Sequence, residues 1–261
     1  MAHPNFLLNS RILIIGGSSG LGFAVASGAL ANGSKVHVTS ATAEKLSTKT
    51  AQLQSLYPSA HVSGSAVDLS STETLATNLQ TVLDAAVKET GESLDHIVYT
   101  AGNSLPTTPL AEMTVTTALS PFTVRFLGPL LVAKHVAANP GKYLNAVAAS
   151  SITLTSGAMA HRPRRGVVGI GAAGAVEVLT KSLAVELAPI RVNVIIPGTV
   201  HTEFVDKMLV GKPDMLNVFK AGSLTKELGT PEGAAEAYMF CMRSALATGQ
   251  GFTIDNGRWL V

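Results

Sequence analysis

Three glycines near the start of the chain have the spacing of a phosphate-binding loop. Gly16, Gly20 and Gly22 stand in "IIGGSSGLGFAVA", between a β-branched run and a stretch with helical spacing. In such a loop the first glycine permits a tight turn, the second lets the backbone approach a pyrophosphate, and the third allows close helix packing. The N-terminus of the helix then faces the phosphates. Strand, turn and helix in this order predict a dinucleotide site; a purely structural glycine turn is the alternative.

The end of the second predicted strand bears on the choice of nucleotide. A carboxylate there holds a ribose 2′-hydroxyl and repels a 2′-phosphate. This chain has the uncharged residues Ser40, Ala41 and Thr42, with Lys45 close behind. We therefore expect NADP(H) rather than NAD(H), with a modest preference because no arginine is present to clamp the phosphate.

The elements that position this loop alternate between strand and helix patterns. Strands are expected at 11–15, 35–40, 61–68, 94–102, 150–157, 190–198 and 249–255. Helices are expected at 23–33, 42–57, 71–90, in the later part of 117–140, at 171–189 and near 231–244. This alternation predicts the α/β class, with a doubly wound parallel sheet of about seven strands and helices on both faces. No linker or repeat interrupts it, so we expect a single Rossmann-fold domain over residues 1–261.

The composition excludes several classes of function. Hydrophobic residues make up 46% and charged residues 14%, which suits a globular, well-buried, oligomeric protein. A net charge of +2 gives no basic face for nucleic acid. The single Cys241 excludes an internal disulfide framework, and no two histidines have metal-ligand spacing, so we expect no metal. The start lacks the pattern of a signal peptide and no apolar run reaches about 18 residues, so we expect a cytoplasmic protein without a membrane span.

Several motifs resemble those of the short-chain dehydrogenase/reductase family, over nearly the whole chain. The segment "IGGSSGLG" is similar to the family's TGxxxGIG, with Ile15 in the place of threonine. Asp68-Leu69 resembles the acid-hydrophobe pair beside adenine, and "YTAG" (99–102) resembles the NNAG segment. "RVNVIIPGTVHTEF" is similar to the segment that lies along the nicotinamide, and "TGQGFTIDNG" to the closing strand.

The resemblance implies a set of cofactor contacts drawn from these motifs and from the end of the second strand. The predicted cofactor-binding residues are Gly16, Ser18, Ser19, Gly20, Leu21, Gly22, Ser40, Ala41, Thr42, Asp68, Leu69, Ala101, Gly102, Pro197, Gly198, Val200 and Thr202.

The departures from the family pattern concern the chemistry. Family members normally use Asn, Ser, Tyr and Lys, of which only the serine is kept, as Ser156. Gly169, thirteen residues later, stands in the place of the tyrosine and Ala173 in the place of the lysine. Arg125 stands in the place of the asparagine. Arg125 and Ser156 are therefore the candidate catalytic residues.

The resemblance narrows to a divergent fungal branch of the family. The segments that carry it are "TVRFLGPLLVAKH", "LTSGAMAHRP" and "GAVEVLTKSLAVELAPIRVN". This branch includes noncanonical reductases and the reductase/Diels–Alderases of indole alkaloid pathways. In those cyclases an arginine stands where Arg125 does, and an aspartate follows the proline that matches Pro163. This chain has Arg164 there, which reverses the charge.

Two reductive routes need no tyrosine. An iminium is already cationic, so hydride alone completes its reduction. A carbonyl can be reduced if the guanidinium of Arg125 holds the developing negative charge, with water supplying the proton through Ser156. Our first hypothesis is an NADP(H)-dependent reductase of secondary metabolism. A redox-neutral cyclase (including a Diels–Alderase-like one), isomerase or dehydratase is the second, and a nonenzymatic nucleotide-binding protein is the third.

Each candidate residue also has a structural interpretation. Arg125 could be an ion-pair partner at a subunit interface, and Ser156 could merely end a strand. The loop 161–165 is a solvated loop or a clamp for an acidic or oxygen-rich molecule. The small residues 169–174 allow close helix packing, extra volume beside the nicotinamide, or both.

The substrate and partners follow from the segment after Gly198. Seven apolar residues there form either a lid for a bulky hydrophobic small molecule or ordinary core packing. They are Phe204, Val205, Met208, Leu209, Met215, Leu216 and Phe219. The family resemblance implies a homodimer or homotetramer packed through two long helices.

Overall fold

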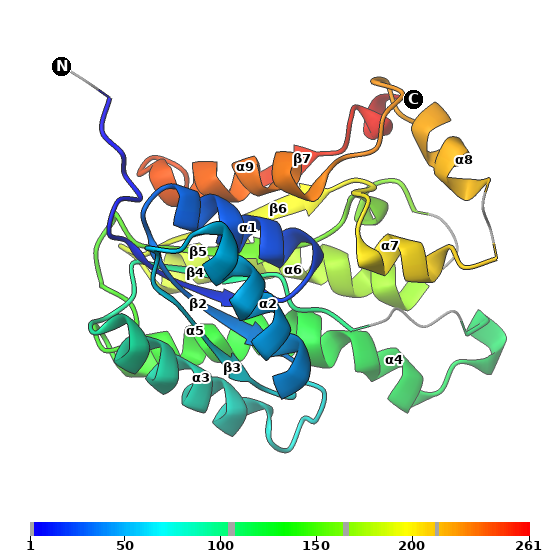
Figure 1. Ribbon diagram of the computed structural model, residues 1–261. Helices are drawn as coiled ribbons and strands as arrows, with labels where there is room; N and C mark the ends of the chain where they lie inside the picture. The colour runs from blue at the N-terminus through cyan, green and yellow to red at the C-terminus, as the bar shows by residue number, and fades with distance from the viewer. Residues whose placement is uncertain (1–2, 104–107, 164–166, 212–213) are drawn as a thin grey trace.

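The computed structural model describes residues 3–103, 108–163, 167–211 and 214–261 (Figure 1). Within these residues the strands form one seven-stranded parallel sheet, in the order β3-β2-β1-β4-β5-β6-β7. The strands are β1 (Arg11–Ile15), β2 (Lys35–Ser40), β3 (Val62–Ala66), β4 (His96–Tyr99), β5 (Ser151–Thr155), β6 (Arg191–Pro197) and β7 (Gly251–Ile254). The predicted α/β class and doubly wound sheet are confirmed; the assignment of all of 1–261 to one domain stays a prediction.

The strand order reverses at β1, which lies between β2 and β4. Ile12 is in register with Val36 of β2 on one side and with His96 of β4 on the other. In open α/β sheets, ligands bind beyond the carboxyl ends of the strands at such a switch point. The site is therefore expected where β1 and β4 end.

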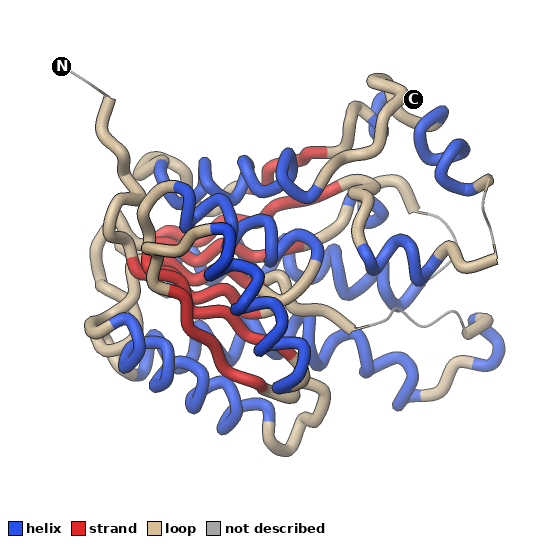
Figure 2. Tube along the Cα trace, viewed as in Figure 1, coloured by secondary structure: helices blue, strands red, loops and turns tan. Residues whose placement is uncertain are grey.

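Helices cover both faces of the sheet (Figure 2). On one face α3 (Leu75–Thr90), α5 (Gly128–Ala138) and α6 (Val167–Glu186) bury an aliphatic cluster against the strands. On the other face α1 (Gly20–Ala31), α2 (Ala43–Leu56) and α9 (Pro231–Arg243) bury a second cluster. Because both faces are covered, central strands such as β4 and β6 are buried along their whole length, which explains their continuous apolar runs.

Several predicted element boundaries were wrong, among them the start of α1, which lies at Gly20 instead of residue 23. The strand predicted at 61–68 ends at Ala66, because the carboxylate of Asp68 accepts the backbone N–H of Ser70 and turns the chain. The strand predicted at 94–102 ends at Tyr99, because the N–H groups of both Thr100 and Ala101 donate to Ile15. The helix predicted at 71–90 begins only at Leu75, and the helix predicted at 171–189 begins already at Val167.

The helix predicted within 117–140 is divided into three parts. They are α4 (Val115–Phe122), a π-helical turn over Thr123–Leu127, and α5. Pro129 has no N–H to donate to the carbonyl of Arg125, and the N–H of Gly128 reaches back five residues to Thr123. Short π-helical turns of this kind occur frequently at functional sites.

Elements beyond the carboxyl edge of the sheet surround the switch point. Figure 1 shows α7 (Glu203–Met208), α8 (Met215–Ala221) and α4 on the side to which the strands point. Three short 3₁₀ turns, at Leu110–Glu112, Ala158–Ala160 and Arg258–Leu260, complete the described elements.

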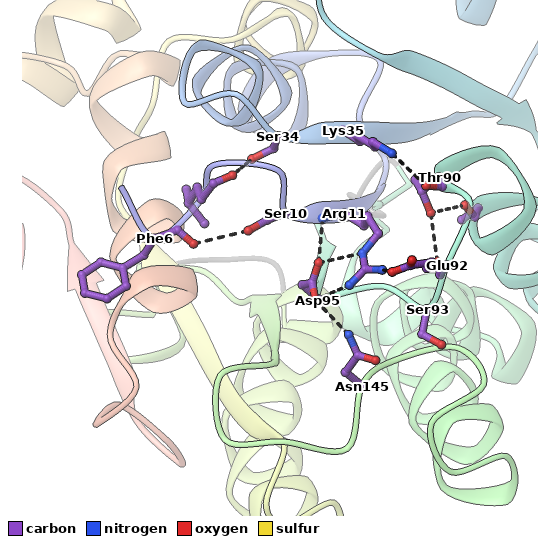
Figure 3. Close-up of polar contacts among 12 residues, drawn as sticks. Phe6, Ser10, Arg11, Ser34, Lys35, Thr90, Glu92, Ser93, Asp95 and Asn145 are labelled. Atoms are coloured by element: carbon purple, nitrogen blue, oxygen red, sulfur yellow. Dashed lines mark hydrogen bonds and ion pairs between the residues drawn. The ribbon is translucent and has the colours of Figure 1, made fainter. Parts of the chain in front are cut away.

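An ion-paired cluster fastens the opposite, amino edge of the sheet (Figure 3). The guanidinium of Arg11 in β1 donates from Nε and Nη2 to the two carboxylate oxygens of Asp95, at 2.9 Å each, and also contacts Glu92. Asn145 donates to the same carboxylate. Burial opposes ionisation of Asp95, but these hydrogen bonds hold its pKa below its usual value. This cluster joins β1 to β4 far from the switch point, so we interpret it as structural.

Two helical stretches of the described chain are long and apolar enough to cross a membrane by length and composition alone. They are Val115–Ala138 and Val168–Glu186. A helix that covers a sheet in a globular protein passes the same test, and both stretches include helices packed on the sheet. The finding is therefore weak support for a membrane span.

Candidate functional site

The glycine loop is shaped by contacts that leave no room for side chains. Gly16 has φ of +93°, and a β-carbon there would lie 2.6 Å from the backbone nitrogen of Ala101. A β-carbon on Gly22 would overlap the carbonyl oxygen of Gly16. The loop after β1 therefore lies directly against the chain leaving β4. This is the bare-backbone cradle that a pyrophosphate requires.

The start of α1 accepts an anion. Ser19 precedes the helix with extended backbone and makes no side-chain capping bond, so the first N–H groups are not satisfied from that side. The N–H of Gly20 donates to Oε2 of Glu203, at 3.0 Å. Glu203 lies 183 residues further along the chain, at the start of α7. Its carboxylate stands in for an anionic ligand at the position where a phosphate would bind, so the loop fits a dinucleotide.

The predicted adenosine-binding residues gather at the ends of β2 and β3. Ser40 ends β2, and its buried Oγ has no hydrogen-bond partner among the described residues. Thr42 caps α2 by accepting the N–H of Lys45. Burial lowers the pKa of Lys45. Asp68 is exposed, and hydrogen bonds from Ser70 lower the pKa of its carboxyl group.

The predicted nicotinamide-binding residues come from the ends of β4 and β6. Ala101 and Gly102 follow β4, while Pro197 ends β6. Thr202 caps α7, and its Cγ2 would be 3.2 Å from a β-carbon on Gly20. The segment after β6 therefore reaches the phosphate loop. The remaining predicted residues of the two ends are Ser18 and Leu21 in the loop, Ala41 between β2 and α2, Leu69 after Asp68, and Gly198 and Val200 before α7.

Arg125 lies on the π-helical turn, against the segment that follows β4. Its Cζ and Nη1 would be 2.5 Å from a β-carbon on Gly102, so the guanidinium rests on the backbone that follows β4. Nη2 donates to the carbonyl of Asn103 at 2.5 Å. Nε is buried without a hydrogen-bond partner, and no carboxylate of the described residues pairs with the group. Burial lowers the pKa of Arg125. Arginine is not deprotonated in proteins, so the group keeps its charge. A guanidinium without a carboxylate partner is suited to hold developing negative charge.

Ser156 follows β5 and points its hydroxyl toward α6. Oγ lies 2.8 Å from Oε1 of Glu177 and 3.0 Å from the carbonyl oxygen of Ala173. The other carboxylate oxygen, Oε2, lies 2.6 Å from Nε2 of His161. Sequence reasoning missed Glu177, and it considered His161 only as part of the loop 161–165. The available signal was spacing, because Glu177 follows Ala173 by four residues and therefore shares its helix face.

The place of the missing tyrosine is not filled by another phenol. Gly169 is buried on α6, where it leaves the position without a side chain. Each of the four tyrosine hydroxyls is hydrogen-bonded elsewhere, to Ser27 (from Tyr57), Val124 (from Tyr99), Lys142 (from Tyr143) and Thr155 (from Tyr238). Burial also raises the pKa of Tyr99 and of Tyr238, which disfavours ionisation of these phenols.

Parts of the predicted substrate region are only partly described. Arg164 and Arg165 of the loop 161–165 lie outside the described residues, and so does the side chain of Met208. Phe204 is 44% exposed, and α8 has no buried residue. Only Val205 of the described apolar residues is buried. This exposure favours the lid interpretation over core packing.

Comparison with known proteins matches this architecture along the whole described chain. A family model described as "SDR-like rossmann domain" matches residues 3–261. The short-chain dehydrogenase/reductase ATR9 of Stachybotrys chlorohalonatus is 39% identical over 250 residues, covering 95% of this chain and 96% of the relative. The short-chain dehydrogenase/reductase ucsE of an Acremonium species is 37% identical, with 94% of each chain covered.

Solved structures of other proteins share the fold of this chain. The MalC reductase/Diels-Alderase from Malbranchea aurantiaca superposes with a TM-score of 0.92, at 33% identity over 98% of this chain and 99% of that one. A short-chain dehydrogenase from Burkholderia cenocepacia in complex with NADP has a TM-score of 0.82 at 23% identity, covering 97% and 98% of the two chains. The second likeness concerns the fold alone.

Proposed function

The chain belongs to the short-chain dehydrogenase/reductase family, and from that premise we propose that it is an NADP(H)-dependent reductase acting without a catalytic tyrosine. Its substrate is an iminium or a polarised carbonyl in a bulky, hydrophobic small molecule of secondary metabolism. A bound reduced nicotinamide would supply the hydride. The observation that carries the proposal is the unpaired guanidinium of Arg125, resting on Gly102 at the switch point.

The role of Arg125 follows from its charge and placement. In the family the asparagine place belongs to the proton relay, and here it holds a permanent cation. A cation cannot assist an iminium, which is itself positive, but it lowers the energy of an alkoxide that forms as hydride arrives. For a carbonyl substrate we therefore assign Arg125 to charge stabilisation. The subunit-interface interpretation is disfavoured, because the guanidinium faces the backbone after β4.

The nucleotide preference rests on the end of β2. Ser40, Ala41 and Thr42 offer no carboxylate to repel a 2′-phosphate, and Lys45 stands one turn into α2. Titration of the enzyme with NADPH and NADH, followed by nucleotide fluorescence, tests the preference. We expect tighter binding of NADPH, and we expect Ala41→Asp to reverse the order by placing a carboxylate at the 2′ position.

The decisive experiment is turnover. Purified protein is incubated with NADPH and a panel of cyclic iminium ions and ketones, and loss of NADPH absorbance is followed together with product formation. Consumption of NADPH in step with reduced product supports the proposal. Binding of NADPH without consumption, across the whole panel, would overturn it and favour a nonenzymatic nucleotide-binding protein.

A redox-neutral cyclase, isomerase or dehydratase is the second candidate. It is favoured by the acid–base group of Glu177 and His161, and by the structural likeness to a protein described as a reductase/Diels-Alderase. Conversion of a substrate without any change in NADPH absorbance would establish this alternative.

A further inference from the structure

The carboxylate of Glu177 forms hydrogen bonds with two side chains, Ser156 and His161, to which the proposed reductase function has so far assigned no joint role. Its Oε1 accepts the hydroxyl of Ser156 at 2.8 Å, and its Oε2 lies 2.6 Å from Nε2 of His161. The three residues come from three elements: the end of β5, the loop after the turn Ala158–Ala160, and α6. A continuous hydrogen-bonded path therefore runs from Ser156 to His161.

The path leads from the interior to solvent. The side chain of Glu177 is 16% exposed, whereas that of His161 is 41% exposed. The imidazole stacks on the indole of Trp259, with ring centroids 4.1 Å apart. Trp259 is itself fixed, because Nε1 donates to the carbonyl of Ala158 at 3.2 Å. His161 is thus held in one orientation while it exchanges protons with water.

A purely structural role explains the geometry less well. A neutral side chain such as glutamine would fasten Ser156 without the cost of desolvating a charge. Glu177 is a partly buried carboxylate, and no lysine or arginine of the described residues pairs with it. Its only described ion-pair partner is the imidazole of His161, whose ring nitrogens can donate or accept a proton. Groups paired in this way are suited to move protons.

We propose that Ser156, Glu177 and His161 form a proton relay that replaces the missing tyrosine and lysine. The proposal rests on the reductase function and deepens it. Ser156 is the candidate catalytic residue, because it occupies the family's serine place beside the reacting group. Glu177 and His161 act through it and are positioning residues.

Reduction of a carbonyl substrate needs one proton in addition to the hydride. Hydride delivered to the carbonyl carbon forms a C–H bond, breaks the C=O π bond and leaves an alkoxide. The alkoxide takes the proton of Ser156 Oγ, which leaves a seryl alkoxide beside the carboxylate of Glu177. His161, as an imidazolium, gives its Nε2 proton to Oε2 of Glu177. The carboxyl group turns about its Cγ–Cδ bond and passes this proton to Oγ, and water reprotonates His161. Net uptake is one hydride and one solvent proton for each alcohol formed.

The relay predicts a dependence on substrate class. Reduction of an iminium needs no proton, so it bypasses Ser156, Glu177 and His161. Reduction of a ketone needs one, and loss of a general acid typically slows such a step by about 10²–10⁴-fold. The same variant should therefore lose much more activity on a ketone than on an iminium.

The kinetic experiment compares Glu177→Gln and Ser156→Ala with the matched control Glu186→Gln, which removes an exposed carboxylate from the same helix. We expect both relay variants to lower kcat for a ketone about 10²-fold more than they lower kcat for an iminium. Wild-type ketone reduction should show a solvent deuterium isotope effect that Glu177→Gln loses. Equal loss on both substrates would overturn the relay and indicate a structural role.

A second measurement needs no turnover. In protein labelled with ¹⁵N-histidine, the proton on Nε2 of His161 should give a downfield signal because of its short bond to Glu177, and Glu177→Gln should shift it upfield. Glu186→Gln should not move it. Absence of this signal in the folded wild-type protein would overturn the relay, whether or not any substrate is reduced. Failure of all substrates with the signal present would instead count against the reductase function.

Discussion

The guanidinium of Arg125 occupies the space that a side chain at position 102 would need. A β-carbon on Gly102 would come within 2.5 Å of Cζ of Arg125. The two residues belong to different elements, the π-helical turn and the segment after β4. A glycine at 102 and an arginine at 125 are therefore one unit, in which the bare backbone allows the charge to approach the crevice.

Substitution at either member of this pair should impair reduction. Arg125→Gln removes the charge and Gly102→Ala displaces it, so we expect each to lower kcat for a ketone by about 10²–10³-fold. Steady-state kinetics with saturating NADPH measure this loss. Gly171→Ala is the matched control, because a β-carbon there meets only Phe122 at 3.9 Å on an exposed helix position. Full activity of Gly102→Ala would contradict the assignment of Arg125.

Removal of the charge of Glu203 should tighten nucleotide binding. Its carboxylate holds the N–H of Gly20, where a phosphate would bind, and must leave before the phosphate arrives. We expect Glu203→Gln to bind NADPH several-fold more tightly, because the neutral amide competes less well for a helix N-terminus. Fluorescence titration gives the dissociation constants, and Glu232→Gln at the start of α9 is the control. Weaker binding by the Glu203 variant would show that this contact does not compete with phosphate.

Two buried histidines should make the fold acid-sensitive. Burial lowers the pKa of His37 and of His96 from the usual 6.5 to about 4. The unfolded chain therefore binds more protons between about pH 6.5 and 4, and the free energy of unfolding falls as the pH drops through that window, by roughly 3 kcal/mol for each histidine at most.

Urea unfolding at pH 7 and at pH 5 measures this effect. His37 bridges Ser63 and Ser65, at 2.8 and 2.9 Å. We expect His37→Gln to be less stable than the wild type at pH 7 but to lose less stability on acidification. An unchanged pH dependence would mean that His37 does not titrate on unfolding.

Apolar side chains on α6 predict how copies of the chain associate. Val178 is 67% exposed and Val185 is 78% exposed, and their spacing of seven residues places them on one helix face. We expect the double variant Val178→Asp, Val185→Asp to shift the protein from oligomer to monomer in size-exclusion chromatography with light scattering. Leu246, which is 97% exposed in the loop after α9, provides the control Leu246→Asp. A wild-type protein that is already monomeric would contradict the prediction.

Residue patterns in the sequence predicted the sheet and the glycine loop because each strand, turn and helix is specified by residues close together in the chain. The glycine spacing belongs to one strand–turn–helix unit, in which Gly22 packs against the carbonyl of Gly16, and the alternation of strands and helices leaves few topologies open. The π-helical turn was missed because Pro129 was weighed only as a helix limit. Its effect lies four residues upstream, on the carbonyl of Arg125.

Hydrogen bonds between residues far apart in the chain could not be predicted from the sequence alone. Glu203 reaches Gly20 across 183 residues, and Glu177 reaches Ser156 across 21. Neither Glu203 nor Glu177 belongs to a recognisable sequence motif. Each acquires its contact only through the tertiary packing of α7 and α6. The kept Ser156 was predictable from the family pattern, but its hydrogen-bond partners were not.

The π-helical turn before Pro129 also sets the direction in which Arg125 faces. Each residue of an α-helix advances the side-chain direction by about 100°. A chain shortened by one residue between Thr123 and Leu127 would return this region to regular winding and turn the guanidinium away from the crevice. The direction of the Arg125 guanidinium therefore depends on the winding of the helix, which Pro129 interrupts.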